Sequence, residues 1–126
     1  MDFHKKDAIY LQIVEMVCEN IISKRWEEGE KIPSVRELAV SVEVNPNTVM
    51  RSYTYLQERD IIHIKRGIGY FVSENAYSNT LEIMRTNFVR NDLPIFFKTI
   101  KLLNMDFEEL KKRFAQYERE KDEDKS

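Results

Sequence analysis

Two helix N-cap signals, eleven residues apart, constrain the fold of this chain more than any other feature. In Ser34-Val-Arg-Glu37, the serine hydroxyl can accept from the glutamate amide while the glutamate carboxylate reaches back, which makes a capping box. In Asn45-Pro46, the asparagine can cap the next helix, and proline fits its first position. Only a short helix ending near Val42 fits between the two signals, so the sequence predicts a helix-turn-helix.

A longer helix precedes this pair, and a β-hairpin follows it. Residues 8–24 predict an amphipathic helix, because isoleucine or valine recurs at every fourth position. After the second capped helix ends near Asp60, the β-prone runs 61–65 and 70–73 enclose two of the chain's three glycines. This order of elements is that of a winged helix-turn-helix, whose second paired helix enters the DNA major groove.

The remainder of the chain predicts only helices, with a boundary at Pro94 and a second capping box that begins at Asp106. The almost wholly charged residues 118–126 are expected to fray into solvent. A tail this small cannot bury its own aromatic side chains, so we expect an intermolecular helical interface. The predicted interface residues are Leu81, Met84, Phe88, Phe96, Ile100, Phe107, Leu110 and Phe114. The predicted fold is therefore mainly α with a small β-hairpin: a winged helix-turn-helix domain at 1–75, then a short all-helical dimerisation region at 76–126.

Side chains suited to DNA occur at three places in these elements. At the start of the second capped helix, asparagine can pair with adenine, arginine with guanine, and threonine with phosphate or a thymine methyl group. Free N–H groups there, and the serine and arginine that begin the preceding helix, are expected to contact phosphate. In the hairpin, two cations adjoin glycines that allow close approach of the backbone. The candidate DNA-binding residues are Tyr10, Ser34, Arg36, Asn45, Asn47, Thr48, Arg51, Tyr55, Lys65, Arg66, Gly67 and Gly69.

Each of these candidates also has a purely structural interpretation. Asn47 and Arg51 could belong to an ordinary solvated helix face, and Asn45 is foremost a helix cap. Charged hairpin tips can serve only to protect an edge strand. Tyr10 is as well suited to packing as to DNA contact, and Tyr55 lies nearer the polar face of its helix, where it could touch phosphate.

Charge does not by itself favour nucleic acid. The net charge is −2 at pH 7, and residues 1–75 contain ten Lys and Arg against twelve Asp and Glu. Non-specific attraction would not hold this chain on DNA, so the DNA interpretation depends on a few cations that converge on one face. The alternative is a winged-helix adaptor that binds another protein and has no specific operator, and a steep salt dependence of binding would separate the two.

Other classes of function have little support in the sequence. The two histidines, His4 and His63, have no cysteine or carboxylate at metal-ligand spacing. Cys18 falls on the apolar side of its helix and is interpreted as a core residue, and a single cysteine suits a reducing cytosol. No apolar run of about 18 residues predicts a membrane span, and no signal peptide is recognisable. We expect a cytoplasmic protein that is not an enzyme and uses no metal, cofactor or membrane.

Four motifs, in the same order, resemble the GntR family of bacterial transcription regulators: Ile9-Tyr-Leu-Gln-Ile13, Gly29-Glu-Lys-Ile-Pro-Ser-Val-Arg-Glu-Leu-Ala39, Val44-Asn-Pro-Asn-Thr-Val49 and Arg66-Gly-Ile-Gly-Tyr-Phe-Val72. Together they cover about residues 8–75, and the third motif with a short tail resembles the YtrA-type subfamily. The resemblance implies a homodimer on a palindromic operator, with the helical tail as the dimerisation element. Members of this subfamily often regulate transport operons, frequently as repressors.

Two departures from the family pattern concern base contacts. Many members carry arginine where Met50 stands, whereas here Arg51 follows one place later. Many also carry arginine where Pro46 stands. The sequence therefore leaves open whether Arg51 reads a base or holds a phosphate. It identifies no small-molecule effector, and the tail is too short for the ligand-binding domains of larger members.

Overall fold

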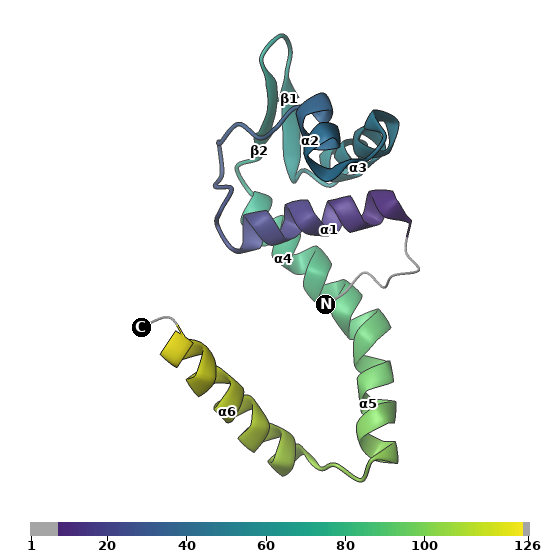
Figure 1. The fold of residues 1–126 in the computed structure, drawn as a ribbon, viewed down its shortest axis with the longest axis vertical. Coiled ribbons are helices and arrows are strands. Elements are labelled where there is room, and N and C mark those ends of the chain that lie inside the picture. The colour runs from purple at the N-terminus through teal and green to yellow at the C-terminus, as the bar shows by residue number, and fades with distance from the viewer. Residues whose placement is uncertain (1–7, 125–126) are drawn as a thin grey trace. The chain divides into compact units, whose positions relative to one another are not determined.

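The computed structural model describes residues 8–124. The chain divides into two compact units, with the division between Thr86 and Asn87. The expected fold class is confirmed, because the structure is mostly helical and contains one two-stranded antiparallel hairpin. Figure 1 shows the order of the elements along the chain.

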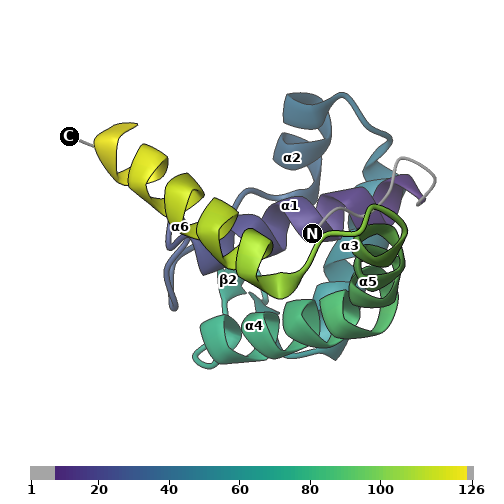
Figure 2. The same cartoon turned by 90° about the horizontal axis from the view of Figure 1, so that it is seen from below.

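The first unit is the predicted winged helix-turn-helix. Its elements are α1 (Ile9–Ile22), α2 (Val35–Val42), α3 (Pro46–Glu58), β1 (Ile62–Lys65), β2 (Gly69–Val72) and α4 (Ala76–Asn87). The hairpin extends beyond the helix-turn-helix pair as a wing, and α4 begins beside the C-terminal end of α1 in both views (Figures 1 and 2). In the wing, Lys65 pairs with Gly69 at the turn and Ile62 pairs with Val72 at the base.

The core of this unit lies where α1, α2, α3 and the wing meet. Helix α1 contributes Ile13, Val17 and Ile21 among its buried residues, as its sequence spacing predicts. Ile9 has the same spacing but is 56% exposed, because it begins the helix one turn before the residues that face the core. The apolar positions spaced four residues apart on α1 therefore face the core as expected, except for the first of them, Ile9.

Tyr53 joins three elements of this core. Its side chain on α3 is fully buried, and its hydroxyl donates to the carbonyl of Pro33, just before α2, at 2.7 Å. Its ring meets that of Tyr70 on β2 edge-on, with 4.8 Å between the ring centroids. Helix α3, the segment before α2 and the wing are thus connected through one residue.

The segment before α2 also pairs with the wing, which the sequence did not predict. The amide of Ile32 donates to the carbonyl of Tyr70 at 3.0 Å, and Lys31 forms an isolated bridge with Phe71. The sequence indicates only a break in this region, because glycine and proline interrupt it. In the structure, this segment lies along the edge of β2 and extends the two-stranded wing.

One buried side chain of the first unit leads to a stability prediction. Thr80 on α4 is fully buried, and its hydroxyl has no hydrogen-bond partner within the described residues. We expect Thr80→Val to raise the free energy of unfolding by about 1 kcal/mol, because an unpaired polar group is exchanged for a methyl group of similar shape. Chemical denaturation monitored by circular dichroism measures this change.

Ser52→Ala is the matched control for Thr80→Val, since Ser52 is equally buried but its hydroxyl donates to the carbonyl of Tyr10 at 2.7 Å. This control is expected to destabilise the protein by about 1–2 kcal/mol. A Thr80→Val variant that is less stable than the wild type would contradict the prediction.

The second unit contains a π-helical turn and two helices. These elements are η1 (Phe88–Asp92), α5 (Leu93–Leu102) and α6 (Phe107–Asp124). The boundary expected at Pro94 takes the form of the wide turn η1 immediately before α5. Proline has no amide to donate to the carbonyl four residues earlier and its ring crowds that carbonyl, which favours this local widening.

Helix α6 differs from the sequence expectation at both ends. The carboxylate of Asp106 accepts from the amide of Glu109 at 2.9 Å, so one half of the predicted capping box is present. The carboxylate of Glu109 instead accepts from Arg113 at 2.9 Å. The charged segment from Glu118 was expected to fray, but it is helical through Asp124, with its side chains in solvent. No helix within residues 8–124 is both long and apolar enough to cross a membrane.

Candidate nucleic-acid interface

The start of α3 is capped as predicted, but the cap occupies the amides that were expected to be free. The side-chain oxygen of Asn45 accepts from the amide of Asn47 at 2.8 Å, and its carbonyl accepts from the amide of Thr48 at 2.9 Å. Pro46 has no amide hydrogen. The expectation of free N–H groups for phosphate is therefore wrong at these positions, and the side chains remain to contact DNA.

The outward face of α3 carries the expected polar residues, and one of them is held by α1. Asn47 and Arg51 are exposed. The guanidinium of Arg51 lies 3.8 Å from the ring centroid of Tyr10, which is a cation–π contact. The start of α1 is itself fixed on α3, because the Ser52 hydroxyl donates to the Tyr10 carbonyl. The structure thus brings Tyr10 and Arg51 together at the edge of α3 that adjoins α1.

Tyr55 extends this edge toward the C-terminal end of α3. Its ring meets that of Tyr10 edge-on at 6.4 Å, and the guanidinium of Arg59 lies 3.4 Å from its centroid. Arg59 also donates to the carbonyl of Tyr55 at 3.0 Å. Tyr55 is half-buried under these contacts. Its clearest role is to support its neighbours.

The opposite edge of α3 adjoins the wing. The hydroxyl of Tyr70 donates to the sulfur of Met50 at 3.8 Å, a distance typical of a weak bond to a thioether. Met50 is nevertheless 45% exposed. The outward face of α3 is therefore flanked by a cation on the α1 side and by an apolar side chain on the wing side.

The capping box at the start of α2 is confirmed. The hydroxyl of Ser34 accepts from the amide of Glu37 at 3.1 Å, and the Glu37 carboxylate accepts from the amide of Ser34 at 2.9 Å. The bond from the Ser34 amide to this carboxylate, and after it the nearby Ser34 hydroxyl, lower the pKa of Glu37. Because the pKa is lowered in the folded state, the box stabilises the fold at neutral pH and is lost as the pH falls through that pKa. Arg36 is exposed in the first turn beside the box.

The wing carries more positive charge than the sequence indicates. Lys65 and Arg66 are exposed at its turn, where Gly67 has a φ of 77°. Gly69 was expected to admit DNA, but a Cβ at this position would lie 3.0 Å from the Cε atom of Lys31. The absent side chain of Gly69 thus gives room to Lys31, whose ammonium is brought to the turn.

Lys31 is a candidate that sequence reasoning missed. The signal that could have found it is the alternation of side chains in an extended segment, where neighbours point to opposite faces. Because Ile32 is buried in the core, its neighbour Lys31 faces outward. The exposed cations of the segment before α2, of α2 and α3, and of the wing are Lys31, Arg36, Arg51, Lys65 and Arg66. None of these five forms an ion pair with a carboxylate within the part of the chain that the structure describes. Their charges are therefore available to an external anion.

A model of the bacterial regulatory proteins called the gntR family matches residues 9–72, slightly more than half of the chain. The chain belongs to the GntR family. It is 34% identical to the uncharacterized HTH-type transcriptional regulator YhcF of Bacillus subtilis, over 86% of this chain and 88% of YhcF. It is 39% identical to the HTH-type transcriptional repressor YtrA of the same organism, over 65% of this chain and 63% of YtrA. A GntR-family regulator from Bacteroides thetaiotaomicron, solved by crystallography, matches with a TM-score of 0.73 and 38% identity, over 90% of this chain and 99% of that one.

These matches confirm the resemblance to the YtrA-type regulators. They also make the first unit of this GntR protein the DNA-binding winged helix of a transcription regulator, and the relatives are regulators rather than enzymes. Within residues 8–124, no three His, Cys, Asp or Glu side chains gather as a metal site, while His4 lies outside the described residues. Cys18 is buried in the core, and burial raises the pKa of its thiol to about 12.

The second unit of this GntR protein exposes many large apolar side chains. Of the predicted interface residues, Phe88, Phe96, Phe107 and Phe114 are between 41% and 64% exposed. The others are more enclosed: Leu81, Met84 and Leu110 are half-buried, and Ile100 is 8% exposed. Leu81 and Met84 belong to α4 of the first unit, where Met84 packs against the core. Other exposed apolar residues of this unit are Val89, Ile95, Phe97, Leu102, Leu103 and Tyr117.

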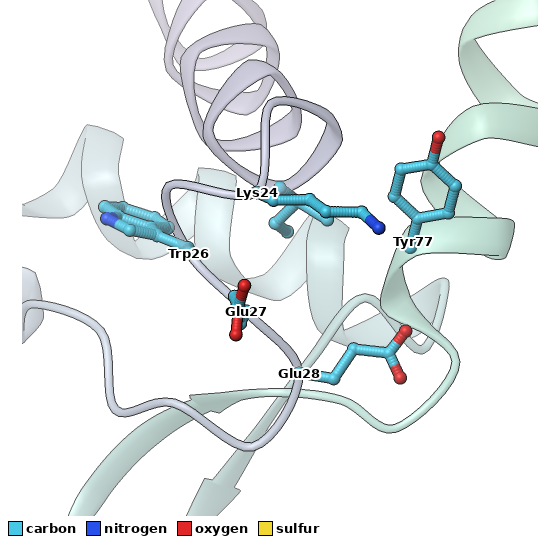
Figure 3. Close-up of a pocket in the computed structure, with 6 residues that line it drawn as sticks. Lys24, Trp26, Glu27, Glu28 and Tyr77 are labelled. Atoms are coloured by element: carbon cyan, nitrogen blue, oxygen red, sulfur yellow. The ribbon is translucent and has the colours of Figure 1, made fainter.

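A separate hollow of about 340 Å³ lies between the end of α1, the loop that follows it and the start of α4. Figure 3 shows Lys24 and Glu28 directed toward Tyr77, with Trp26 on the other side of Lys24. The ammonium of Lys24 lies 5.2 Å from the ring centroid of Tyr77. Neither α3 nor the wing lines this hollow, so it is not part of the candidate DNA-binding surface.

Proposed function

We propose that this GntR-family protein is a cytoplasmic repressor that binds a palindromic operator as a homodimer. The observation that carries the proposal is the set of five exposed cations, free of intrachain ion pairs within the described residues, on the segment before α2, on α2 and α3, and on the wing. This local set offsets the unfavourable net charge of −2, because phosphate contacts depend on local charge. The relative YtrA is named a repressor, which supports repression rather than activation.

Most of the exposed candidate residues contact DNA in this proposal. Asn47 reads an adenine in the major groove, and Thr48 contacts phosphate beside it. Arg51 holds phosphate rather than a base, which its contact with the Tyr10 ring supports, since that contact draws the guanidinium toward α1. The other candidate phosphate contacts are Lys31, Ser34, Arg36, Lys65 and Arg66, with Gly67 forming the wing turn.

The second unit supplies the dimer interface in this proposal. Phe97, Ile100 and Phe107 belong to the mainly apolar lining of a hollow of about 460 Å³ beside the turn between α5 and α6. A single protomer leaves this hollow and the phenylalanines around it in water, which is typical of a surface that another protein covers. A two-fold dimer would bury these side chains against their own copies and bring two winged helices to one operator.

The test is a fluorescence-anisotropy titration of the full chain against its own upstream DNA, with scrambled competitor, at two salt concentrations. Saturable, competitor-resistant binding of one dimer per site, weakened steeply by salt, is expected. Binding no tighter than to scrambled DNA would overturn the proposal. It would favour the protein-binding adaptor, a function that the acidic balance of the chain also suits.

Arg51→Ala separates phosphate contact from base reading. We expect this variant to bind every operator sequence about tenfold more weakly, the size of one charge-assisted hydrogen bond, and to reduce the salt slope by about one. Lys31→Ala should behave in the same way. The measurement is anisotropy with the operator and its single-base variants. Relaxed preference at one base position in Arg51→Ala would instead identify Arg51 as a base contact.

A further inference from the structure

We infer that Met50 makes this protein select thymine at one position of each operator half-site, by apolar contact with the C5 methyl group. The inference rests on the proposed operator binding and specifies one part of its sequence preference. In this inference a base is read by an apolar side chain, Met50, at the edge of α3 that adjoins the wing.

Met50 lies at the right place on α3 for such a contact. It is three residues after Asn47, so the two side chains are neighbours on the helix surface near its N-terminal end. Although Met50 follows the fully buried Val49, it is 45% exposed. Arg51, which follows it, is drawn toward Tyr10 on the other edge. Asn47 and Met50 take no part in the contact between Arg51 and Tyr10. Both side chains therefore still face outward from α3 near its N-terminal end.

The position of the Met50 side chain is set by the core. Its sulfur accepts from the hydroxyl of Tyr70 at 3.8 Å. Tyr70 is itself fixed by its edge contact with Tyr53, whose hydroxyl is bonded to Pro33. A methionine side chain usually has three freely rotating bonds, and this contact restricts them. The thioether is therefore presented to DNA in an ordered position.

The surroundings of Met50 are apolar as well. Ile64 on β1 is the cross-strand partner of Tyr70, so both side chains are on the same face of the wing. Ile64 is 50% exposed. Met50 and Ile64 thus both adjoin Tyr70, and each leaves about half of an apolar side chain uncovered where α3 meets the wing.

Chemistry then selects the base. A methionine has no donor, and the only acceptor of Met50 is engaged by Tyr70. It therefore cannot pair with the hydrogen-bonding edge of guanine or adenine. In the major groove the C5 methyl group of thymine is the apolar feature of the base edges, and apolar side chains read it by contact.

The experiment removes this methyl group without changing base pairing. In the operator found by footprinting, each thymine of a half-site is replaced in turn by deoxyuridine, and affinity is measured by anisotropy. We expect one position at which the wild type loses about fourfold in affinity, the size of burying one methyl group. Met50→Ala should bind thymine and deoxyuridine equally at that position, and Met50→Leu should still distinguish them.

Val40→Ala is the matched control, because Val40 on α2 is an apolar residue that is 80% exposed and outside the proposed interface. It should keep the full fourfold discrimination, and thermal unfolding should show all three variants to be folded. The inference is overturned if the wild type is insensitive at every thymine, or if Met50→Ala keeps the discrimination. In both cases operator binding itself would still stand. A wild type that recognises no operator would overturn this inference together with the proposed function.

Discussion

Tyr53→Ala is expected to lower the free energy of unfolding of the winged-helix unit by about 3–5 kcal/mol, the usual loss when a buried aromatic residue is truncated. Tyr53 is fully buried, its ring contacts Tyr70, and its hydroxyl donates to Pro33 at 2.7 Å. Truncation therefore leaves a cavity where α3, the segment before α2 and the wing meet. Urea denaturation followed by circular dichroism measures the loss.

Tyr53→Phe isolates the hydroxyl from the ring. It keeps the packing but leaves the carbonyl of Pro33 without this donor, so a smaller loss of about 1–2 kcal/mol is expected. Burial raises the pKa of Tyr53 above its ordinary value. The contribution of the phenol is therefore complete below about pH 10, the unfolded pKa, and is lost as the pH rises toward the raised value. The phenylalanine variant should lack this alkaline loss.

Tyr77→Ala is the control for the aromatic truncation. Tyr77 is half-buried and its ring contacts the exposed Lys24, so a much smaller loss is expected than for Tyr53. If Tyr53→Ala destabilised the protein no more than Tyr77→Ala, the central role assigned to Tyr53 would be wrong. Differential scanning calorimetry of the two variants gives the comparison directly.

Phe114→Glu is expected to convert the protein to a monomer and to weaken operator binding by about a hundredfold or more. Phe114 is 61% exposed in the protomer, so a carboxylate there does not disturb the fold of α6. In the proposed dimer the carboxylate would be buried without a partner, which is strongly unfavourable. Loss of the dimer removes the second half-site contact, and linked sites gain about 10²–10⁴ in affinity. Analytical ultracentrifugation and anisotropy measure the two effects.

Lys112→Glu is the control for Phe114→Glu. It places a carboxylate on the side of α6 opposite the helix's aromatic residues, Phe107, Phe114 and Tyr117. Lys112 is exposed, and this variant should stay dimeric and bind the operator with nearly the affinity of the wild type. A Phe114→Glu variant that sediments as a dimer would show that α6 is not at the interface. A monomeric variant that still binds with full affinity would show that dimerisation is not needed for operator binding.

Local signals made most of the winged helix predictable. The capping box at Ser34 and the cap at Asn45 each depend on side chains within three residues, and both are present in the structure. The hairpin follows in the same way from two β-prone runs around glycines. Such features do not require knowledge of distant contacts, and sequence patterns record them directly.

Contacts between distant residues were not predictable. The stacking of Arg51 on Tyr10 joins residues in different helices, and neither residue type requires it. The pairing of the Lys31 segment with β2 is equally non-local. In the tail, helical spacing grouped Ile100 with exposed phenylalanines, although Ile100 is buried within the protomer. Periodicity shows which residues share a face, but it does not show what covers that face.

The space that Gly69 leaves for Lys31 has a consequence for how this sequence can change over evolution. Because a Cβ at position 69 would lie 3.0 Å from Cε of Lys31, a larger residue at 69 is compatible only with a shorter or redirected side chain at 31. The φ of 142° at Gly69 adds strain to any such replacement. Homologous chains with this wing turn should therefore keep glycine at 69 whatever residue stands at 31, while a long side chain at 31 is accommodated only beside that glycine.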